Sequence, residues 1–342
     1  MKNKITLISC IIILFSSILF INNIDKGISN FEDCEILLKN NNTVNSESNI
    51  IECYNLVAIK YSNLKTPQDA LNYFKNYIKN TKYKELINCH NILHSIGASF
   101  YDTYKNKALI PNIELCLYGY YHGIFQKSDK TTNNYNKFLS IICENKKGEN
   151  LNLCKAAVSH GYGHSLSNSF SSLSEAFINC DLILSKIEIE KENCAYGVIM
   201  ERYSTDEKIN LNSCLNDYSS DITAGCLLGL GQHSLKNSVN FSDSCPDKIL
   251  NKLFYEKCTR GLGFAIASSL LYNHNNKLPN NEYIDTMIKD CSSIYSCSSG
   301  AGSILTSTIR NLNNALSYCE NYFVNKDCRD SAIKTARLEN IT

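Results

Sequence analysis

The sequence has no excess of charge of either sign. Its 34 Lys and Arg residues oppose 33 Asp and Glu residues, which gives a formal net charge of +1. Non-specific binding to nucleic acid requires a marked positive charge that replaces the counterions of the phosphates. The composition therefore gives no support for a nucleic-acid partner. Tryptophan is absent and only four prolines occur, a bias to which we assign no function.

Three short motifs of metal and thiol chemistry are also missing. The chain contains no H-E-x-x-H sequence, which argues against a metalloprotease of that type. It contains no C-x-x-C-H sequence, which argues against covalently attached haem. We expect neither haem nor a nucleotide cofactor. No C-x-x-C sequence occurs either, so a thiol oxidoreductase is weakly supported and would need several reactive free thiols.

The first 22 residues resemble a targeting segment. Lys2 and Lys4 precede an apolar run that extends from Ile5 to Ile21, an order typical of signal sequences. No A-x-A cleavage pattern follows, so we interpret residues 1–22 as an uncleaved signal anchor, with a cleaved signal peptide as the alternative. The remainder would be exported, either held at the membrane through this helix or secreted. Cys10 lies before the apolar core, and we do not expect it to carry a lipid.

Cysteine is the most informative residue type in the chain. Of the 17 cysteines, 16 remain when Cys10 is set aside, an even number. In an exported protein, an even set of cysteines indicates disulfide bonds, whereas in a cytosolic protein it would indicate metal binding. The apolar leader favours the disulfide interpretation.

The cysteines mark a repeat. Seven segments of the form C-x-x-small-x-x-x-x follow one another at intervals of 31 to 40 residues, and five of them have glycine at the fourth position. They begin at Cys116, Cys154, Cys194, Cys226, Cys258, Cys297 and, in degenerate form, Cys328. A period of this length is typical of helical hairpins in tandem. No convincing strand pattern interrupts them.

A second cysteine precedes each copy from the second onward, at the end of a segment with helical periodicity. We expect a short helix, a polar turn, and a second helix with the motif cysteine in its first turn. The preferred disulfides are Cys143/Cys154, Cys180/Cys194, Cys214/Cys226, Cys245/Cys258, Cys291/Cys297 and Cys319/Cys328. Each such bond would contribute about 3 kcal/mol in the chain-entropy model. Pairing across one hairpin, such as Cys116 with Cys143, stays open, and Cys34/Cys53 and Cys89/Cys116 are assigned weakly.

The recurring glycines require an explanation, because glycine within a helix costs about 1 kcal/mol relative to alanine. Close approach of neighbouring helix backbones would compensate for this cost. The motif cysteine, the glycine three residues later and the residue seven positions after the cysteine share one helix face. We expect this face to pack inward.

Six of the seven histidines lie in the motif helices. His122 and His160 are six residues after their motif cysteine, and His94 is five residues after Cys89. The other candidate ligands are His164, His233 and Met200, with Glu201 as a candidate general base. If the copies superpose, these side chains lie at one level of equivalent helices and meet on the inner face of the array.

The spacing of four residues in His90/His94 and in His160/His164 places two imidazoles on one helix face, which suits chelation of one ion. Zn, Cu or Fe would fit such ligands. The alternative is that each histidine beside a glycine simply bonds a neighbouring carbonyl. The tyrosines of Y-G-Y-Y, Tyr118, Tyr120 and Tyr121, are more typical of core or rim residues than of a substrate platform.

The runs C-H-N-I-L-H-S-I-G, C-L-Y-G-Y-Y-H-G and S-H-G-Y-G-H-S-L resemble those of exported bacterial and archaeal proteins with C-H-x-x-x-H-x-x-G and C-x-x-G-x-x-H-G motifs. The likeness covers residues 85–335 and implies no assigned activity. The motif is also loosely similar to lanthionine-synthetase cyclases, which are α/α toroids with Gly-rich inner helices and a zinc bound by Cys and His. Cysteines that recur in pairs in every repeat depart from that pattern. The likeness implies a ring of helices rather than cyclase chemistry.

Together these observations predict an all-α protein of tandem helical hairpins stapled by disulfides, arranged as an α/α toroid or a short solenoid. Residues 23–62 would be a polar linker and residues 63–342 the repeat domain. The predicted function is extracytoplasmic metal binding, with metal-dependent hydrolysis or other metalloenzyme activity as its enzymatic form. The alternative is a non-catalytic cell-surface binding module, in which the His and Gly residues serve packing. In either case the inner face could take a small-molecule or protein ligand.

Overall fold

The computed structural model describes the greater part of the chain. The described residues are 30–35, 46–82, 89–110, 116, 118–128, 132–184, 188–204, 209–234, 245–246, 248, 251–273, 281–323, 326–339 and 341. They form helices and connecting turns without a strand, so the all-α prediction is confirmed. The chain divides into two compact units, residues 1–87 and 88–342, which are described separately.

The first unit is a pair of helices closed by a single helical turn. Its elements are η1 (Phe31–Cys34), α3 (Ser46–Leu64) and α4 (Pro67–Asn80). The Thr66 side chain caps α4 by accepting from the Asp69 backbone N–H, and proline occupies the first turn, as helix starts favour. Stacked and edge-on aromatic rings, including Phe31, Tyr54 and Phe74, fill the interior, and Cys34–Cys53 joins η1 to α3.

This unit differs from the polar linker expected over residues 23–62. Helix α3 occupies much of that range, and the boundary between the units falls at Ile87. The reason is visible in α3, whose buried residues Ile50, Cys53, Tyr54 and Val57 recur at helical intervals among polar neighbours. No described helix is both long and apolar enough to cross a bilayer. The predicted leader, residues 1–22, and Cys10 lie outside the described residues.

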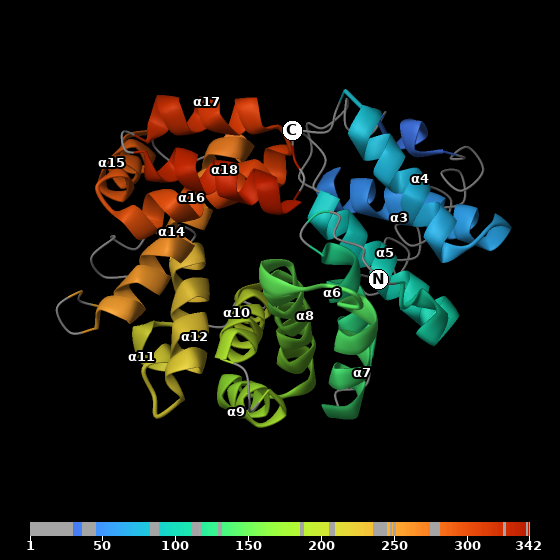
Figure 1. Ribbon diagram of the computed structural model, residues 1–342, viewed down its shortest axis with the longest axis horizontal. Helices are drawn as coiled ribbons and strands as arrows, with labels where there is room; N and C mark the ends of the chain where they lie inside the picture. Colours follow the sequence, from blue (N-terminus) through green and yellow to red (C-terminus); the bar gives the residue numbers. More distant parts are fainter. Residues whose placement is uncertain are drawn as a thin grey trace, which may run out of the picture. The chain divides into compact units, whose positions relative to one another are not determined.

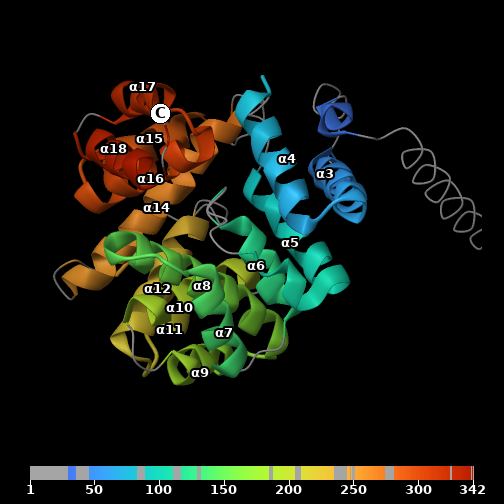
Figure 2. The ribbon, with the colours of Figure 1, turned by 45° about the vertical axis from the view of Figure 1, so that its right-hand side comes forward.

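The second unit is an inner row of helices covered by shorter outer helices. The inner row is α5 (Cys89–Tyr104), α6 (Gly119–Lys127), α8 (Gly148–Ser169), α10 (Glu188–Ser204), α12 (Ser220–His233), α14 (Lys252–Asn273), α16 (Tyr295–Ile309) and α18 (Asp327–Glu339). The outer elements are η2 (Lys105–Ala108), α7 (Thr132–Ile142), α9 (Leu173–Ile183), α11 (Leu211–Cys214), α15 (Asn281–Ser292) and α17 (Leu312–Tyr322). Each inner helix packs against the next one along the chain, and this order can be followed in Figures 1 and 2. The motif copies are therefore lateral neighbours.

Disulfides join the outer helices to the inner row. The six preferred short-range pairs are formed, and so are the two weakly assigned ones, Cys34–Cys53 and Cys89–Cys116. The expected position of the motif cysteine within its helix needs correction. In α8, α10, α12 and α14 it lies in the second helical turn, because these helices begin about one turn earlier, among polar residues.

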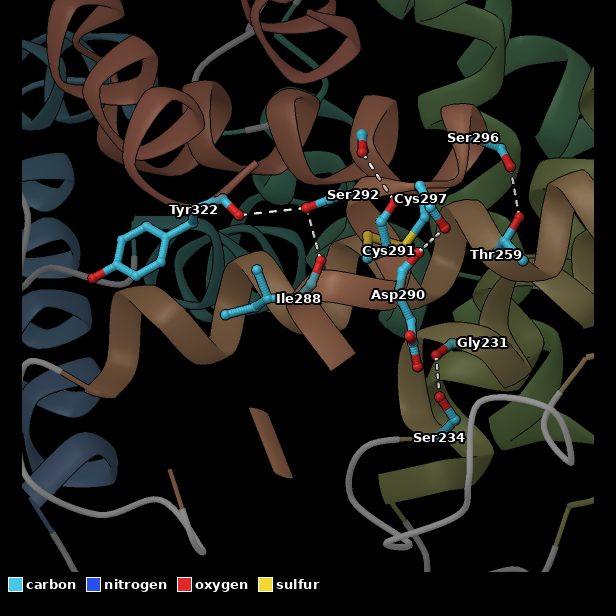
Figure 3. The surroundings of a disulfide bond; sticks show 12 residues. Gly231, Ser234, Thr259, Ile288, Asp290, Cys291, Ser292, Ser296, Cys297 and Tyr322 are labelled. Carbon is cyan, nitrogen blue, oxygen red and sulfur yellow. Dashed lines mark hydrogen bonds between the residues drawn. A yellow bond between two sulfur atoms is a disulfide. The ribbon is translucent and has the colours of Figure 1, made fainter. Parts of the chain in front are cut away.

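The disulfide with the shortest loop, Cys291–Cys297, shows how an outer helix connects to the next inner helix (Figure 3). The Cys291 carbonyl accepts from the Ile294 backbone N–H and from the Ser298 hydroxyl, at 2.9 and 3.0 Å. The Ser292 hydroxyl donates to the Ile288 carbonyl within α15 and to the Tyr322 carbonyl at the end of α17. The buried polar groups at this corner are therefore satisfied locally, as a tight helix–helix connection requires.

The glycines allow the inner helices to touch through their backbones. A Cβ atom on Gly163 of α8 would overlap the carbonyl oxygen of Cys194 in α10, and one on Gly197 of α10 would overlap the carbonyl oxygen of His160 in α8. The contact between α12 and α14 is reciprocal in the same way, through Gly231 and Gly261. The inward packing expected of this face is thus observed, and backbone contact compensates for the low helix propensity of glycine.

Candidate metal centre

Four adjacent inner helices bring their polar side chains to one place. His90 and His94 come from α5, His122 from α6, and His160 and His164 from α8. We call these five residues the histidine cluster. Glu201 reaches it from α10. The helices carry these residues to a common level because each packs on the next, α5 on α6, α6 on α8 and α8 on α10.

The centre of the cluster is tightly packed. The ring centroid of His122 lies 4.9 Å from that of His160 and 5.6 Å from that of His164. The ring centroids of His160 and His164 are 4.8 Å apart. These three residues offer ring nitrogens that all lie within 4.8 Å of one another. Their side chains are buried, with exposures of 2%, 8% and 7%.

The His164 imidazole is held at both nitrogens. Its Nδ1 lies 2.9 Å from Oε2 of Glu201, and its Nε2 lies 3.2 Å from Nε2 of His160. Donation from Nδ1 to the carboxylate leaves Nε2 with its lone pair directed toward His160. A histidine that ligates a metal commonly has this arrangement, in which the other ring nitrogen donates to a carboxylate.

Glu201 is tied down by several donors. Besides His164, the Asn168 amide donates to its Oε1 at 3.0 Å, and the Gln126 amide lies 3.5 Å from its Oε2. Burial raises the pKa of the Glu201 carboxyl, but the hydrogen bond and charge of His164 and the Asn168 amide lower it more, so its pKa lies below the ordinary value. A carboxylate bonded in this way orients His164 and is poorly suited to the role of general base that the sequence suggested.

His122 occupies the middle of the cluster and differs from its neighbours. Within the described part of the chain, neither of its ring nitrogens has a hydrogen-bond partner. Burial, followed by the proximity of His160 and His90, lowers the pKa of this imidazole well below its usual value. Buried polar groups almost always find a partner, so this neutral ring is a candidate for an external ligand.

His160 is likewise kept neutral. Burial, followed by the proximity of His164 and His90, lowers its pKa well below the usual value, and the Asn193 backbone carbonyl acts in the opposite direction. The Tyr196 ring covers the His160 ring at a centroid distance of 4.6 Å. His122 and His160 are therefore neutral imidazoles, the form in which histidine binds metals.

His90 and His94 border the cluster on the α5 side and are partly exposed. Nδ1 of His90 lies 2.9 Å from the Cys116 carbonyl oxygen and donates to it, since a carbonyl only accepts. His90 is 5.0 Å and His94 is 5.9 Å from His122, measured between ring centroids. Burial and the proximity of His164 and His90 lower the pKa of His94 to about 3.

The ring spacing fits a bound ion. Three imidazoles on one tetrahedral ion have centroids about 5 Å apart, given metal–nitrogen bonds of about 2.0–2.1 Å. The separations among His122, His160 and His164, 4.8 to 5.6 Å, bracket this value. Three nitrogen ligands with an orienting carboxylate suit zinc and other borderline divalent ions. The sixteen cysteines outside the leader are disulfide-bonded and supply no thiolate.

The remaining predicted residues lie elsewhere. The His233 ring stacks on Tyr203 at 4.3 Å and makes no ring contact with the histidine cluster among the described residues. Met200 is half-buried on α10 beside Glu201. The hydroxyls of Tyr120 and Tyr121 donate to the carbonyls of Ala108 and Ile110, so these tyrosines are core residues. His274, the seventh histidine, lies outside the described residues.

Sequence reasoning missed three supporting residues. Asn168 lies four residues after His164 and so shares its helix face, a signal that the spacing contained. Gln126 and Tyr196 carry no comparable signal, because they reach the site only through the packing of α6 and α10 against α8.

Comparison with known proteins adds no identity. No family model matches the chain, and neither a curated protein nor a solved structure matches it. The functional conclusion therefore depends on the geometry of the histidine cluster.

Proposed function

We propose that this is an exported metal-binding protein that holds a divalent ion, with Zn²⁺ as the best fit, between His122, His160 and His164. The observation that carries the proposal is the convergence of three buried imidazoles, one of them without a hydrogen-bond partner in the described structure. Eight disulfides are typical of an oxidising compartment outside the cytoplasm and support the export of the chain.

The number of ligands suggests what the ion does. Structural zinc sites are closed by four protein ligands, whereas catalytic sites have three and keep a position for water. A metal-bound water with a pKa lowered to about 7 is a nucleophile for hydrolysis. Partial exposure of His94 and Glu201 places the solvent-accessible edge of the cluster beside the three ligands. We therefore infer a small-molecule hydrolase as the enzymatic form of this function.

The rival function is a binding module in which the histidines serve packing. It is favoured by His90, whose Nδ1 donates to the backbone oxygen of Cys116. The glycines do serve packing, and this fact is compatible with both functions. The burial of His122 without a partner is what the rival leaves unexplained.

Metal analysis of the untagged full chain tests the proposal. Protein equilibrated with Zn²⁺ and dialysed should retain zinc, and the double variant His160→Ala/His164→Ala should lose it. The control is His233→Ala, which removes a buried histidine outside the cluster and should retain the metal. A wild-type chain that folds with its eight disulfides but retains no zinc would overturn the proposal and favour the packing role.

A further inference from the structure

Two histidine pairs with i, i+4 spacing border His122, namely His160/His164 on α8 and His90/His94 on α5. The rings of His94 and His164 also lie close together, with centroids 5.7 Å apart. The nearest ring of each pair is at almost the same distance from His122, 4.9 Å for His160 and 5.0 Å for His90.

Each pair also contains one imidazole whose Nδ1 is anchored to an oxygen. His164 donates to Glu201, and His90 donates to the Cys116 carbonyl. This anchoring fixes the tautomer and leaves Nε2 as the coordinating atom, which is the arrangement that metal-ligating histidines adopt. His164 and His90 are therefore both oriented to bind a metal through Nε2.

A single ion leaves one feature unexplained. It would engage one nitrogen of His122 and leave the other buried without a partner in the described region, which typically costs about 1–3 kcal/mol. Nδ1 of His164 and Nδ1 of His90 each have an oxygen partner. Neither ring nitrogen of His122 has a hydrogen-bond partner among the described residues. A second ion on the α5 side would satisfy the remaining nitrogen.

We propose that the centre binds two divalent ions of the Zn²⁺ or Cu²⁺ type and that His122 bridges them through its two ring nitrogens. His160 and His164 complete one site, and His90 and His94 complete the other. This proposal rests on the proposed function, since it assigns a second ion to the same cluster. Binding of both ions displaces the single N–H proton of His122, which passes to solvent, and no oxidation or reduction is involved.

The second site is wider than the first. The ring centroids of His90 and His94 are 6.2 Å apart, and that of His94 is 5.9 Å from His122. Coordination of an ion there requires the ring of His94 to move closer to His90 and His122. The deprotonated bridge and the Glu201 carboxylate together supply two negative charges against the four positive charges of the ions.

Zinc stoichiometry distinguishes one ion from two. The untagged full chain, saturated with Zn²⁺ and dialysed, should retain two ions per chain by elemental analysis, and His90→Ala/His94→Ala should retain one. The control His233→Ala should retain two, and all variants are checked for eight disulfides and native circular dichroism. One ion in both the wild type and His90→Ala/His94→Ala would overturn the bridge while leaving the proposed function intact. No ion in the wild type would overturn both.

Loading the protein with Cu²⁺ tests directly whether the His122 imidazole bridges two ions. Two Cu²⁺ ions joined by one imidazole couple their spins, so the low-temperature electron paramagnetic resonance signal of the loaded protein should integrate to less than half of its copper content. The variant His90→Ala/His94→Ala should bind one copper and show its full signal. A wild-type signal that accounts for two uncoupled coppers would overturn the bridge.

Discussion

At the scale of single residues, the site depends on where the protons of neutral imidazoles lie. Glu201 fixes the proton of His164 on Nδ1, and the Cys116 carbonyl does the same for His90. Nε2 of His164 then faces Nε2 of His160, and burial holds the pKa values of His122 and His160 well below the usual value. Changes to an orienting group should therefore affect metal affinity without removing a ligand.

Replacement of Glu201 tests this orienting role. Glu201→Gln keeps a carbonyl oxygen that accepts from His164 but removes the charge, so Zn²⁺ affinity should fall about 10- to 100-fold. A competition titration with a chromophoric chelator measures the change. Glu256→Gln, which alters a carboxylate in a surface pair with Lys252, is the control and should have no effect. Equal affinities in the wild type and Glu201→Gln would show that the carboxylate does not act on the site.

The metal-free protein should lose stability in mild acid. Burial lowers the pKa of His94 to about 3 and that of His122 well below its usual value. Between about pH 6.5 and these lower values, the unfolded chain binds more protons than the folded one, so the free energy of unfolding falls by about 1.4 kcal/mol per pH unit for each such group as pH decreases. Urea unfolding with a chelator present, at pH 7.5, 6 and 5, measures the slope.

The variant His122→Gln supplies the comparison for this pH dependence. It removes one group that is neutral only in the folded state, so its stability should vary less steeply with pH than that of the wild type. Identical slopes for the two proteins would contradict the assignment of a neutral, buried His122.

At the scale of helices, backbone contact between neighbours decides which glycines are indispensable. In α12, Gly231 faces the backbone carbonyl of Cys258, whereas Gly229 faces the side chain of Ile199. A Cβ on Gly231 would lie 2.0 Å from the Cys258 oxygen, whereas one on Gly229 would lie 2.4 Å from Cγ2 and 2.7 Å from Cβ of Ile199. Both substitutions therefore require neighbouring atoms to shift, and the overlap at Gly231 is the deeper one.

This difference gives a matched pair of substitutions. Gly231→Ala should destabilise the fold by about 1–3 kcal/mol, because overpacking outweighs the gain of about 1 kcal/mol in helix propensity. Gly229→Ala should cost less, since the overlap that it creates with Ile199 is shallower than the overlap with the Cys258 oxygen. Thermal and urea unfolding under oxidising conditions would measure both changes. A greater loss for Gly229→Ala would show that close helix contact does not set the cost.

At the scale of the whole second unit, a structural change in one inner helix should affect mainly the helices that contact it. Each inner helix contacts its neighbours in the row, as in other repeat arrays, so damage to one staple should remain local. The bond Cys180–Cys194 ties α9 to α10, the helix that carries Glu201. The bond Cys291–Cys297 ties α15 to α16, which packs against α14 and α18 instead.

Removal of these two staples should therefore have different consequences. Cys291→Ala/Cys297→Ala should lower stability by about 2 kcal/mol, given its short loop, and leave Zn²⁺ affinity unchanged. Cys180→Ala/Cys194→Ala should cost about 3 kcal/mol and also weaken Zn²⁺ binding several-fold. Hydrogen exchange of α10 and α16, together with zinc titration, would locate the damage. An equal loss of affinity in both variants would show that the array responds as one cooperative body.

Much of this protein can be predicted from its residues. The period of the C-x-x-G copies determines the helical hairpins, and the second cysteine before each copy determines the short-range disulfides. The register of His122 and His160 after their cysteines places both rings at one level of adjacent helices. These features are local, because they depend on helix periodicity and on short loops that keep paired cysteines close together. The sequence pattern predicts a polar linker where the helix over residues 46–64 lies, because polar residues stand between the apolar residues of its buried face.

Only the tertiary structure decides which of these rings meet. His233 lies one residue further from its motif cysteine than His122 does, a rotation of about 100° around the helix, and it stacks on Tyr203 instead of joining the cluster. His90 and Glu201 are held at the cluster by contacts with residues 26 and 37 positions away. The physical reason is that sequence spacing fixes height along a helix, whereas the rotation of each helix and the identity of its neighbour come from packing. The unpartnered nitrogens of His122, on which the metal centre depends, exist only once α5, α6 and α8 are packed together.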